Sequence, residues 1–267
     1  MKQGAWMVLF CLVVSGSASA AQPVVKENTF EVSPEIYYHH YEEPDFAKNS
    51  GILYGAAAAY EFHKAVYARA EARAAFGQVD YSSNGTGTME NIDDWLFEPR
   101  AVGGYDFAIE NGVLLTPFFG FGYRYLNDDS AGRSTTTGAR GYERESNYFY
   151  SPIGLSALVS NESDMKLRVS AEYDLFWTGR QKSHLSDAIA GFNDITNDQS
   201  DGFGLRGSVG IEKTGKTADW YVDSFVRYWN IEDSDLQTVT FNGAAIGQGF
   251  EPANETYEVG AVIGVRF

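Results

Sequence analysis

Cysteine is nearly absent from this sequence of 267 residues, and its scarcity excludes several kinds of chemistry. The one cysteine, Cys11, lies in residues 1–20, where an apolar stretch from Ala5 to Val14 is followed by the small residues Ala18-Ser19-Ala20. This is the pattern of an export signal, and we expect cleavage before Ala21. The exported chain then has no cysteine, so disulfides, cysteine-ligated metals and a thiol nucleophile are excluded.

Long hydrophobic runs and basic clusters are also missing after residue 20. The mean hydropathy is −0.29, and even the apolar stretch of the signal is shorter than the roughly 20 residues that a membrane-spanning helix needs. The chain carries 36 acidic against 20 basic residues, for a formal net charge of −16. Because no basic patch is available to meet phosphates, nucleic acid is not an expected partner.

Histidine is scarce too, with four residues in the whole chain. Only His184 has both serine and aspartate close in sequence, at Ser183, Ser186 and Asp187. Catalytic triads are assembled by geometry rather than by neighbours within one loop, so this grouping is weak support for a hydrolase. We therefore expect a protein that is not an enzyme and that has no cofactor.

What the sequence has in abundance is aromatic residues (15%), glycine, and a period-two alternation of apolar and polar side chains. In residues 257–267, for example, every second side chain from Tyr257 to Phe267 is apolar. Such alternation is typical of β-strands with one apolar and one polar face. Ten segments show it, at residues 29–41, 51–63, 65–77, 95–109, 113–126, 147–159, 165–177, 203–213, 218–231 and 256–267.

The connections between these segments alternate in length. Tight turns are predicted at His63-Lys64, Glu110-Asn111-Gly112, Asn161 to Asp164 and Thr214 to Thr217, and longer polar loops follow the other strands. Short turns at one end and long loops at the other are typical of outer-membrane barrels. We predict an all-β fold: a closed, antiparallel, up-and-down transmembrane β-barrel of about ten strands, within a range of eight to twelve. A soluble periplasmic β-protein is the alternative.

This prediction divides the chain into three parts. Residues 1–20 are the cleaved signal, residues 21–28 a short periplasmic segment, and residues 29–267 the barrel. An even number of strands brings both termini to the short-turn side, so we expect both in the periplasm and the protein in the outer membrane.

The polar faces of the predicted strands carry nearly balanced charge. The acids are Glu31, Glu35, Glu61, Glu71, Glu98, Asp106, Glu172, Asp174, Glu212, Asp223 and Glu258, and the bases are Arg69, Arg73, Arg100, Arg124, Lys166, Arg168, Arg206, Arg227 and Arg266. Buried charges are tolerated when they are paired. We therefore expect a salt-bridged lumen that closes a narrow barrel. The alternative is a small conductive path.

Most of the remaining acidic residues fall in the five predicted long loops. The usual meaning of such a surface is solvation, but converging carboxylates also bind divalent cations. The second and fifth loops contain no base to neutralise their acids. If the loops bind calcium or magnesium, the predicted ligands are Asp93, Asp94, Glu232, Asp233 and Asp235.

The ten strands, the long loops and segments such as Tyr150-Ser-Pro-Ile-Gly-Leu155 resemble the omptin-type barrels of Gram-negative outer membranes. Omptin proteases carry an Asp-x-Asp pair in the second loop and an Asp-x-His dyad in the fourth. Here the second loop has Asp80 alone and the adjacent Asp93-Asp94, and Lys182 stands two residues before His184. The resemblance therefore implies the fold without the protease activity.

Two further resemblances concern smaller motifs. The lipid A deacylases use a His-x-Ser dyad on the barrel wall, and His184-Leu-Ser186 matches it but lies in a predicted loop. The strand from Tyr257 to Phe267 is similar to the aromatic-ending signal that the barrel-assembly machinery reads. Together these features predict a monomeric, non-enzymatic barrel for surface interaction or envelope integrity, in contact with outer-membrane lipid and lipopolysaccharide. A narrow porin-like channel is the second hypothesis, and an omptin-like or lipid-modifying hydrolase the third.

Overall fold

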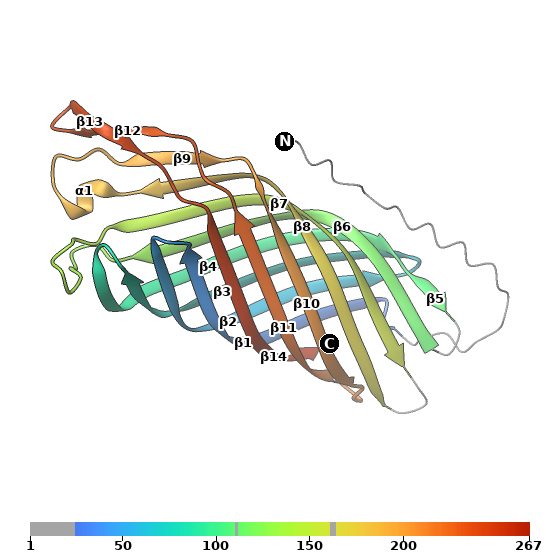
Figure 1. Cartoon of the computed structure of the whole chain (residues 1–267). Coiled ribbons are helices and arrows are strands. Elements are labelled where there is room, and N and C mark those ends of the chain that lie inside the picture. Colours follow the sequence, from blue (N-terminus) through green and yellow to red (C-terminus); the bar gives the residue numbers. More distant parts are fainter. Residues whose placement is uncertain (1–24, 110–111, 161–163) are drawn as a thin grey trace.

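The ten predicted strands form a closed β-barrel in the computed structural model, which describes residues 25–109, 112–160 and 164–267 (Figure 1). The strands of the barrel are β1 (Asn28–Glu43), β2 (Ala47–His63), β3 (Val66–Ser83), β4 (Gly87–Tyr105), β6 (Val113–Asp129), β7 (Glu143–Ser160), β8 (Met165–Ser183), β10 (Gly202–Lys213), β11 (Asp219–Ile231) and β14 (Asn254–Arg266). The predicted signal, and most of the two turns predicted around residues 110–111 and 161–163, lie outside the described residues.

Antiparallel pairing runs all the way around the barrel. Neighbours in sequence pair with one another, β10 pairs with β8, and β14 returns to β1 in a register that runs from Glu31↔Arg266 to Glu42↔Glu255. The short strand β5 (Phe107–Ile109) pairs with β6, and β9 (Ile195–Gln199) pairs with the last residues of β8. Since β1 begins where β14 ends, we call this the turn end of the barrel, and the opposite one the loop end.

The alternation predicted from the sequence separates two surfaces. Apolar and aromatic side chains such as Ile36, Val209, Val259 and Ile263 stand exposed on the outside, whereas charged side chains such as Glu258 are buried inside. Lipid tails form no hydrogen bonds with a protein backbone, so the backbone groups of a spanning strand must be paired within the protein. A closed sheet provides this pairing, and its apolar exterior faces the lipid tails. No helix among the described residues is long and apolar enough to cross a membrane.

The strands continue further at the loop end than the sequence pattern predicted. Asp80 lies within β3, and Asp93 and Asp94 lie within β4, so the prediction that these three acids belong to the second loop is wrong. Asp128 and Asp129 likewise lie within a strand, β6. The connection between β3 and β4 is itself a tight turn. Strand pairing can continue beyond the lipid without an apolar outer face, and the alternation that marks a membrane strand is then lost.

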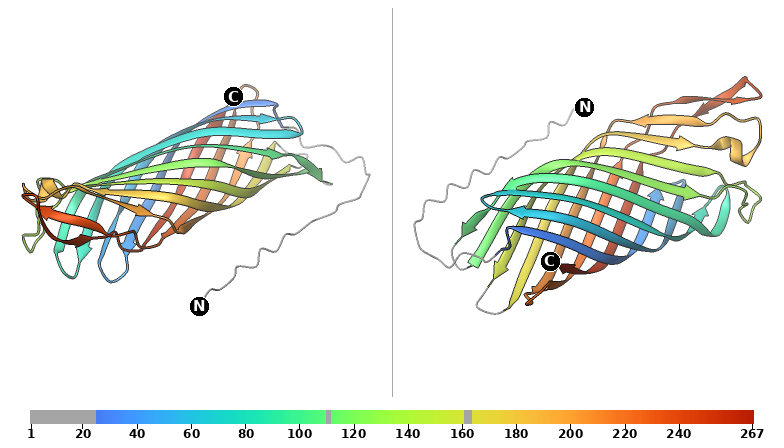
Figure 2. Two further views of the ribbon diagram at one scale, coloured as in Figure 1. Left: turned by 90° about the horizontal axis from the view of Figure 1, so that it is seen from above. Right: turned by 180° about the vertical axis from the view of Figure 1, so that it is seen from behind.

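Three longer connections remain at the loop end, after β6, β8 and β11. The second contains the single-turn helix α1 (Leu185–Ala188) and β9, and the third contains the hairpin of β12 (Gln237–Phe241) and β13 (Ala244–Gly249). Figure 2 shows these elements grouped beyond the barrel wall at one end. They form the rim of the lumen.

Candidate functional site: the charge-paired lumen

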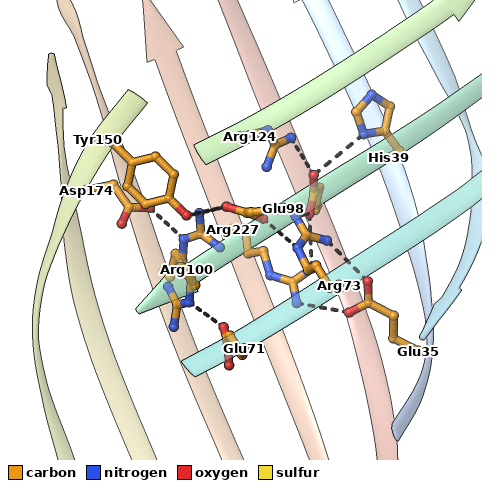
Figure 3. A network of polar contacts seen from close by, with 12 residues as sticks. Glu35, His39, Glu71, Arg73, Glu98, Arg100, Arg124, Tyr150, Asp174 and Arg227 are labelled. Carbon is orange, nitrogen blue, oxygen red and sulfur yellow. Dashed lines mark hydrogen bonds and ion pairs between the residues drawn. The ribbon is translucent and has the colours of Figure 1, made fainter. Parts of the chain in front are cut away.

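Glu258 is shared by three arginines of an ion-pair cluster in the lumen. Figure 3 shows these arginines, Arg73, Arg124 and Arg227. The shared carboxylate is 2.6 Å from Arg124 Nη2, 3.1 Å from Arg73 Nη2 and 3.1 Å from Arg227 Nη1, and its exposed fraction is 0%. These arginines stand on β6, β3 and β11, so one carboxylate of β14 connects distant walls of the barrel. We call the following residues the central cluster: Glu35, Arg73, Glu98, Arg124, Tyr150, Arg206, Arg227 and Glu258.

Glu98 is the second shared carboxylate of the central cluster. Its Oε2 lies 2.5 Å from Arg73 Nε, and its Oε1 accepts hydrogen bonds from the Tyr150 hydroxyl (2.5 Å) and from Arg206. Gly122 provides the space for Tyr150, because a Cβ on Gly122 would stand 2.2 Å from Cζ of the tyrosine. A glycine at this position of β6 thus makes room for a bulky lumen side chain.

Aromatic rings cover the arginines from the loop end. The Trp229 ring lies 5.5 Å from Arg124 Cζ and 5.6 Å from Arg206 Cζ, within the range of cation–π attraction. Trp229 and Tyr150 pack edge to face at 5.0 Å, and both are almost fully buried. The cluster is therefore charged but enclosed, which keeps its ion pairs away from bulk water.

A second set of ion pairs fills the lumen toward the turn end. Arg69 lies 3.1 Å from Glu31 and 2.6 Å from Glu61, and Arg266 lies 2.7 Å from Glu31. Glu212 is paired with Arg266 as well. The ion pairs expected among the inward charges are present, as between Arg69 and Glu61 and between Arg73 and Glu98.

The space that remains in the lumen is divided by the central cluster. A cavity of about 190 Å³ lies on its turn-end side, where it is lined by Glu31 and Glu35 of β1. A smaller cavity of about 40 Å³ lies on its loop-end side, where it is lined by His39 and Tyr41 of the same strand. On β1, Tyr37 stands between the residues that line the larger cavity and those that line the smaller one, and it is 1% exposed. Beyond the smaller cavity, a vestibule of about 340 Å³ lies between the connections of the loop end.

His184 sits at the rim, among acidic side chains of β7 and of the connection after β8. Its Nε2 is 2.7 Å from Glu145 Oε1, and its Nδ1 is 3.5 Å from Asp194 Oδ2. The Ser186 hydroxyl donates its hydrogen bond to Asp194 at 2.7 Å and not to the imidazole. A serine nucleophile needs its hydroxyl held by the base, so these residues do not form a triad in this conformation.

The surroundings of Asp194 favour its ionised form. Burial acts to raise the pKa of Asp194, but the hydrogen bonds from Ser186 and the charge on His184 outweigh it, and the pKa is lowered. Lys182, two residues before His184, lies 3.7 Å from Glu145. A base thus stands where the omptin dyad has aspartate. Glu143, His184 and Asp187 each offer one atom within 4.8 Å of the others, the spacing of a metal site.

The structure separates the five acids predicted as cation ligands. Asp93 points outward and accepts a hydrogen bond from Gln78 at 3.0 Å, whereas Asp94 points into the lumen. Asp233 Oδ1 accepts the backbone N–H of Ala253 at 2.6 Å. Asp235 likewise accepts the backbone N–H of Asp198, at 2.7 Å, so these two acids serve the loop backbone. Cation binding by Asp93, Asp94, Glu232, Asp233 and Asp235 stays a prediction.

No protein-family model and no curated protein sequence matches the chain. Among solved structures, the chain is similar to the outer membrane protease OmpT of Escherichia coli, with a TM-score of 0.65 at 10% identity, over 90% of this chain and 96% of that one. Neisserial surface protein A is 15% identical, with a TM-score of 0.32, over 89% and 97%. The toluene transporter TbuX of Ralstonia pickettii is 8% identical, with a TM-score of 0.38, over 91% and 90%. At these identities the likeness concerns the fold: the chain shares with OmpT the closed, antiparallel β-barrel architecture, here with ten strands.

Proposed function

We propose that the protein is a non-enzymatic barrel of the outer membrane whose lumen is closed by the central cluster. The observation that supports this role most directly is Glu258, a fully buried carboxylate shared by three arginines from different walls. In this proposal the loop end faces the cell exterior and both termini lie in the periplasm. The barrel then supports the envelope and presents an acidic rim for surface contact.

A closed lumen follows from the energetics of these pairs. Removing a charge from water is costly, and the cost is offset only where opposite charges meet in good geometry. Opening an ion path would require Arg73, Arg124 and Arg227 to leave Glu258 together. Barrels of eight strands have room for side chains only, and open aqueous channels are found near sixteen strands, so about ten strands stand close to the closed limit.

The contacts that we propose with the cell envelope are made by the two ends of the barrel. At the turn end, Phe267 pairs with Phe30 through both backbone hydrogen bonds, at 2.9 and 3.4 Å. We propose that this terminal aromatic strand is recognised by the barrel-assembly machinery. At the loop end, the acidic rim would meet lipopolysaccharide through bridging divalent cations, and the barrel acts as a monomer.

Single-channel recording tests the proposal. The refolded protein in a planar lipid bilayer should give no current steps, whereas Glu258→Ala should produce leak or flickering current because three arginines lose a shared partner. Glu255→Ala is the matched control, since Glu255 lies on the same strand and accepts a hydrogen bond from Tyr257 outside the lumen. Regular conductance steps from the wild-type protein would show a pore and contradict the proposal.

A further inference from the structure

Two aspartates face each other across neighbouring strands just beyond the central cluster. Asp94 of β4 and Asp128 of β6 are direct partners in the register, and both line the cavity of about 40 Å³ on the loop-end side. Side chains at such positions stand about 5 Å apart at Cβ. Two negative charges placed opposite each other destabilise a sheet, so this arrangement needs a compensating partner.

Most of the other lumen acids, such as Glu31 and Glu258, are paired with a base. Within the described residues, no basic group lies within ion-pair distance of Asp94 or Asp128. The arginines whose charges act on the pair are engaged elsewhere: Arg124 binds Glu258, and Arg144 binds both Glu43 and Glu251. The loop-end side of the lumen therefore holds more carboxyl groups than bases that could pair with them.

Asp94 is also short of hydrogen-bond donors. It is 7% exposed, and its Oδ1 meets no donor in the part of the chain that the structure describes. A buried carboxylate oxygen without a partner is costly, and a structure that retains one implies a proton, a water or an ion at that place.

Asn49 of β2 supplies an independent indication of what the partner is. Its Nδ2 donates to Asp128 Oδ2 at 2.6 Å, which orients the amide. Its Oδ1 is left buried without a donor among the described residues, and the residue is 6% exposed. A protonated acid, a water or a cation can each satisfy an amide oxygen, but only a divalent cation would also offset the charge of both facing carboxylates.

The site is accessible from the loop end. Asn49, Asp128 and Arg144 line both the small cavity and the vestibule of about 340 Å³, so the two spaces adjoin at these residues. A cavity needs only about 10–15 Å³ to hold one water, so the smaller space can hold an ion with part of its hydration shell.

We propose that Asp94, Asp128 and the amide oxygen of Asn49 bind a divalent cation, with calcium preferred over magnesium. Carboxylate and amide oxygens are the ligands that calcium takes, and calcium accepts irregular sets completed by water, whereas magnesium requires near-octahedral geometry. The ion neutralises the facing aspartates and ties β2, β4 and β6 together below the rim. Of the five ligands predicted from the sequence, this site uses only Asp94.

Calorimetric titration of calcium chloride into the refolded barrel, in a zwitterionic detergent, tests the site. The wild-type protein should bind calcium, and Asp94→Asn and Asp128→Asn should each weaken this binding at least tenfold. Asp129→Asn is the matched control, because Asp129 belongs to the next pair of the same register and lies exposed. This variant should bind as the wild type does. His184→Ala should also retain the site, since it disrupts only the separate group at the rim.

A stability measurement keeps the test decisive if a variant folds poorly. Asparagine removes the repulsion without changing shape, so Asp94→Asn should fold and keep its heat-modifiable gel mobility. Calcium should raise the unfolding midpoint of the wild type, because a ligand of the native state stabilises it. The double variant Asp94→Asn/Asp128→Asn should lose this shift, and sodium at matched ionic strength should not produce it. Equal calcium affinity in the wild type and the double variant, or no binding by either because the aspartates share a proton, would overturn the proposal.

Discussion

Replacing Glu98 with alanine should destabilise the barrel strongly, because two buried arginines lose a shared carboxylate. Glu98 is 1% exposed, so water cannot take its place beside them. Its carboxylate lies 2.5 Å from Arg73 Nε, contacts Arg206 and accepts the Tyr150 hydroxyl. The substitution therefore leaves three buried donors without their acceptor.

The size of this loss of stability depends on the ion pairs that Arg73 and Arg206 retain in the variant. Removing one partner of a buried ion pair costs about 3–5 kcal/mol. Arg73 retains Glu35 at 3.2 Å and Glu258 at 3.1 Å, and Arg206 retains Asp174 at 2.6 Å. Because neither guanidinium becomes fully unpaired, we expect the lower end of the range, about 3 kcal/mol.

Unfolding in denaturant, after refolding into lipid vesicles, measures this loss. Tryptophan fluorescence and gel mobility should report a lower midpoint for Glu98→Ala. Glu71→Ala should shift it less, by about 1–2 kcal/mol, because the Glu71 side chain is 18% exposed and lumen water can solvate the freed Arg69 and Arg100. Glu27→Ala is the control, since its pair with Lys64 at 3.7 Å is exposed. A Glu98→Ala midpoint equal to that of the control would refute a plug held by buried pairs.

Three other predictions address the ends of the barrel. Deleting Phe267 should lower outer-membrane insertion and lead to periplasmic degradation, because the terminal aromatic of β14 is lost; undiminished amounts of heat-modifiable barrel would argue against this. The hydrogen bond from the Ser186 amide to Asp194 (3.1 Å) should persist above the ordinary pKa of aspartate, 3.8, and weaken as the pH falls through the lowered pKa. Amide exchange at Ser186 should accelerate there, and a pH-independent protection factor would contradict it. Millimolar calcium or magnesium should slow trypsin cleavage of the loop end more than sodium at equal ionic strength does. Identical cleavage rates would remove the case for binding by Asp93, Asp94, Glu232, Asp233 and Asp235.

The strands and their two faces could be predicted from the sequence. A side chain in a membrane barrel faces lipid or lumen, and it alternates between them at every residue, so the pattern is local and visible in one strand at a time. This is why the inward positions of Arg69, Arg73, Glu98 and Glu258 follow from the sequence, and why the charge balance of the lumen does as well.

The positions where the strands stop at the loop end could not be predicted in this way. Beyond the lipid, an outward side chain meets water and need not be apolar. The strands β4 and β6 therefore continue through Asp93 and Asp129 without the alternation of apolar and polar residues. The pattern ends where the bilayer ends, whereas the hydrogen-bonded pairing of the strands does not. Acids that the sequence places in separate loops are therefore neighbours on one sheet.

The sequence by itself determined the fold class, the number of strands and the polarity of each face, because these depend on the medium that each side chain meets. Only the tertiary structure decided which charges meet. Partners are set by strand register and by distances across the lumen, and a shift of one residue would exchange every inward side chain for an outward one. Glu258 pairs with three arginines, while Asp94 faces Asp128, which is bound by Asn49, although all are polar residues on inward faces. That difference arises from closure of the barrel. Closure brings side chains from segments far apart in the sequence into contact, and the sequence of one segment does not predict these contacts.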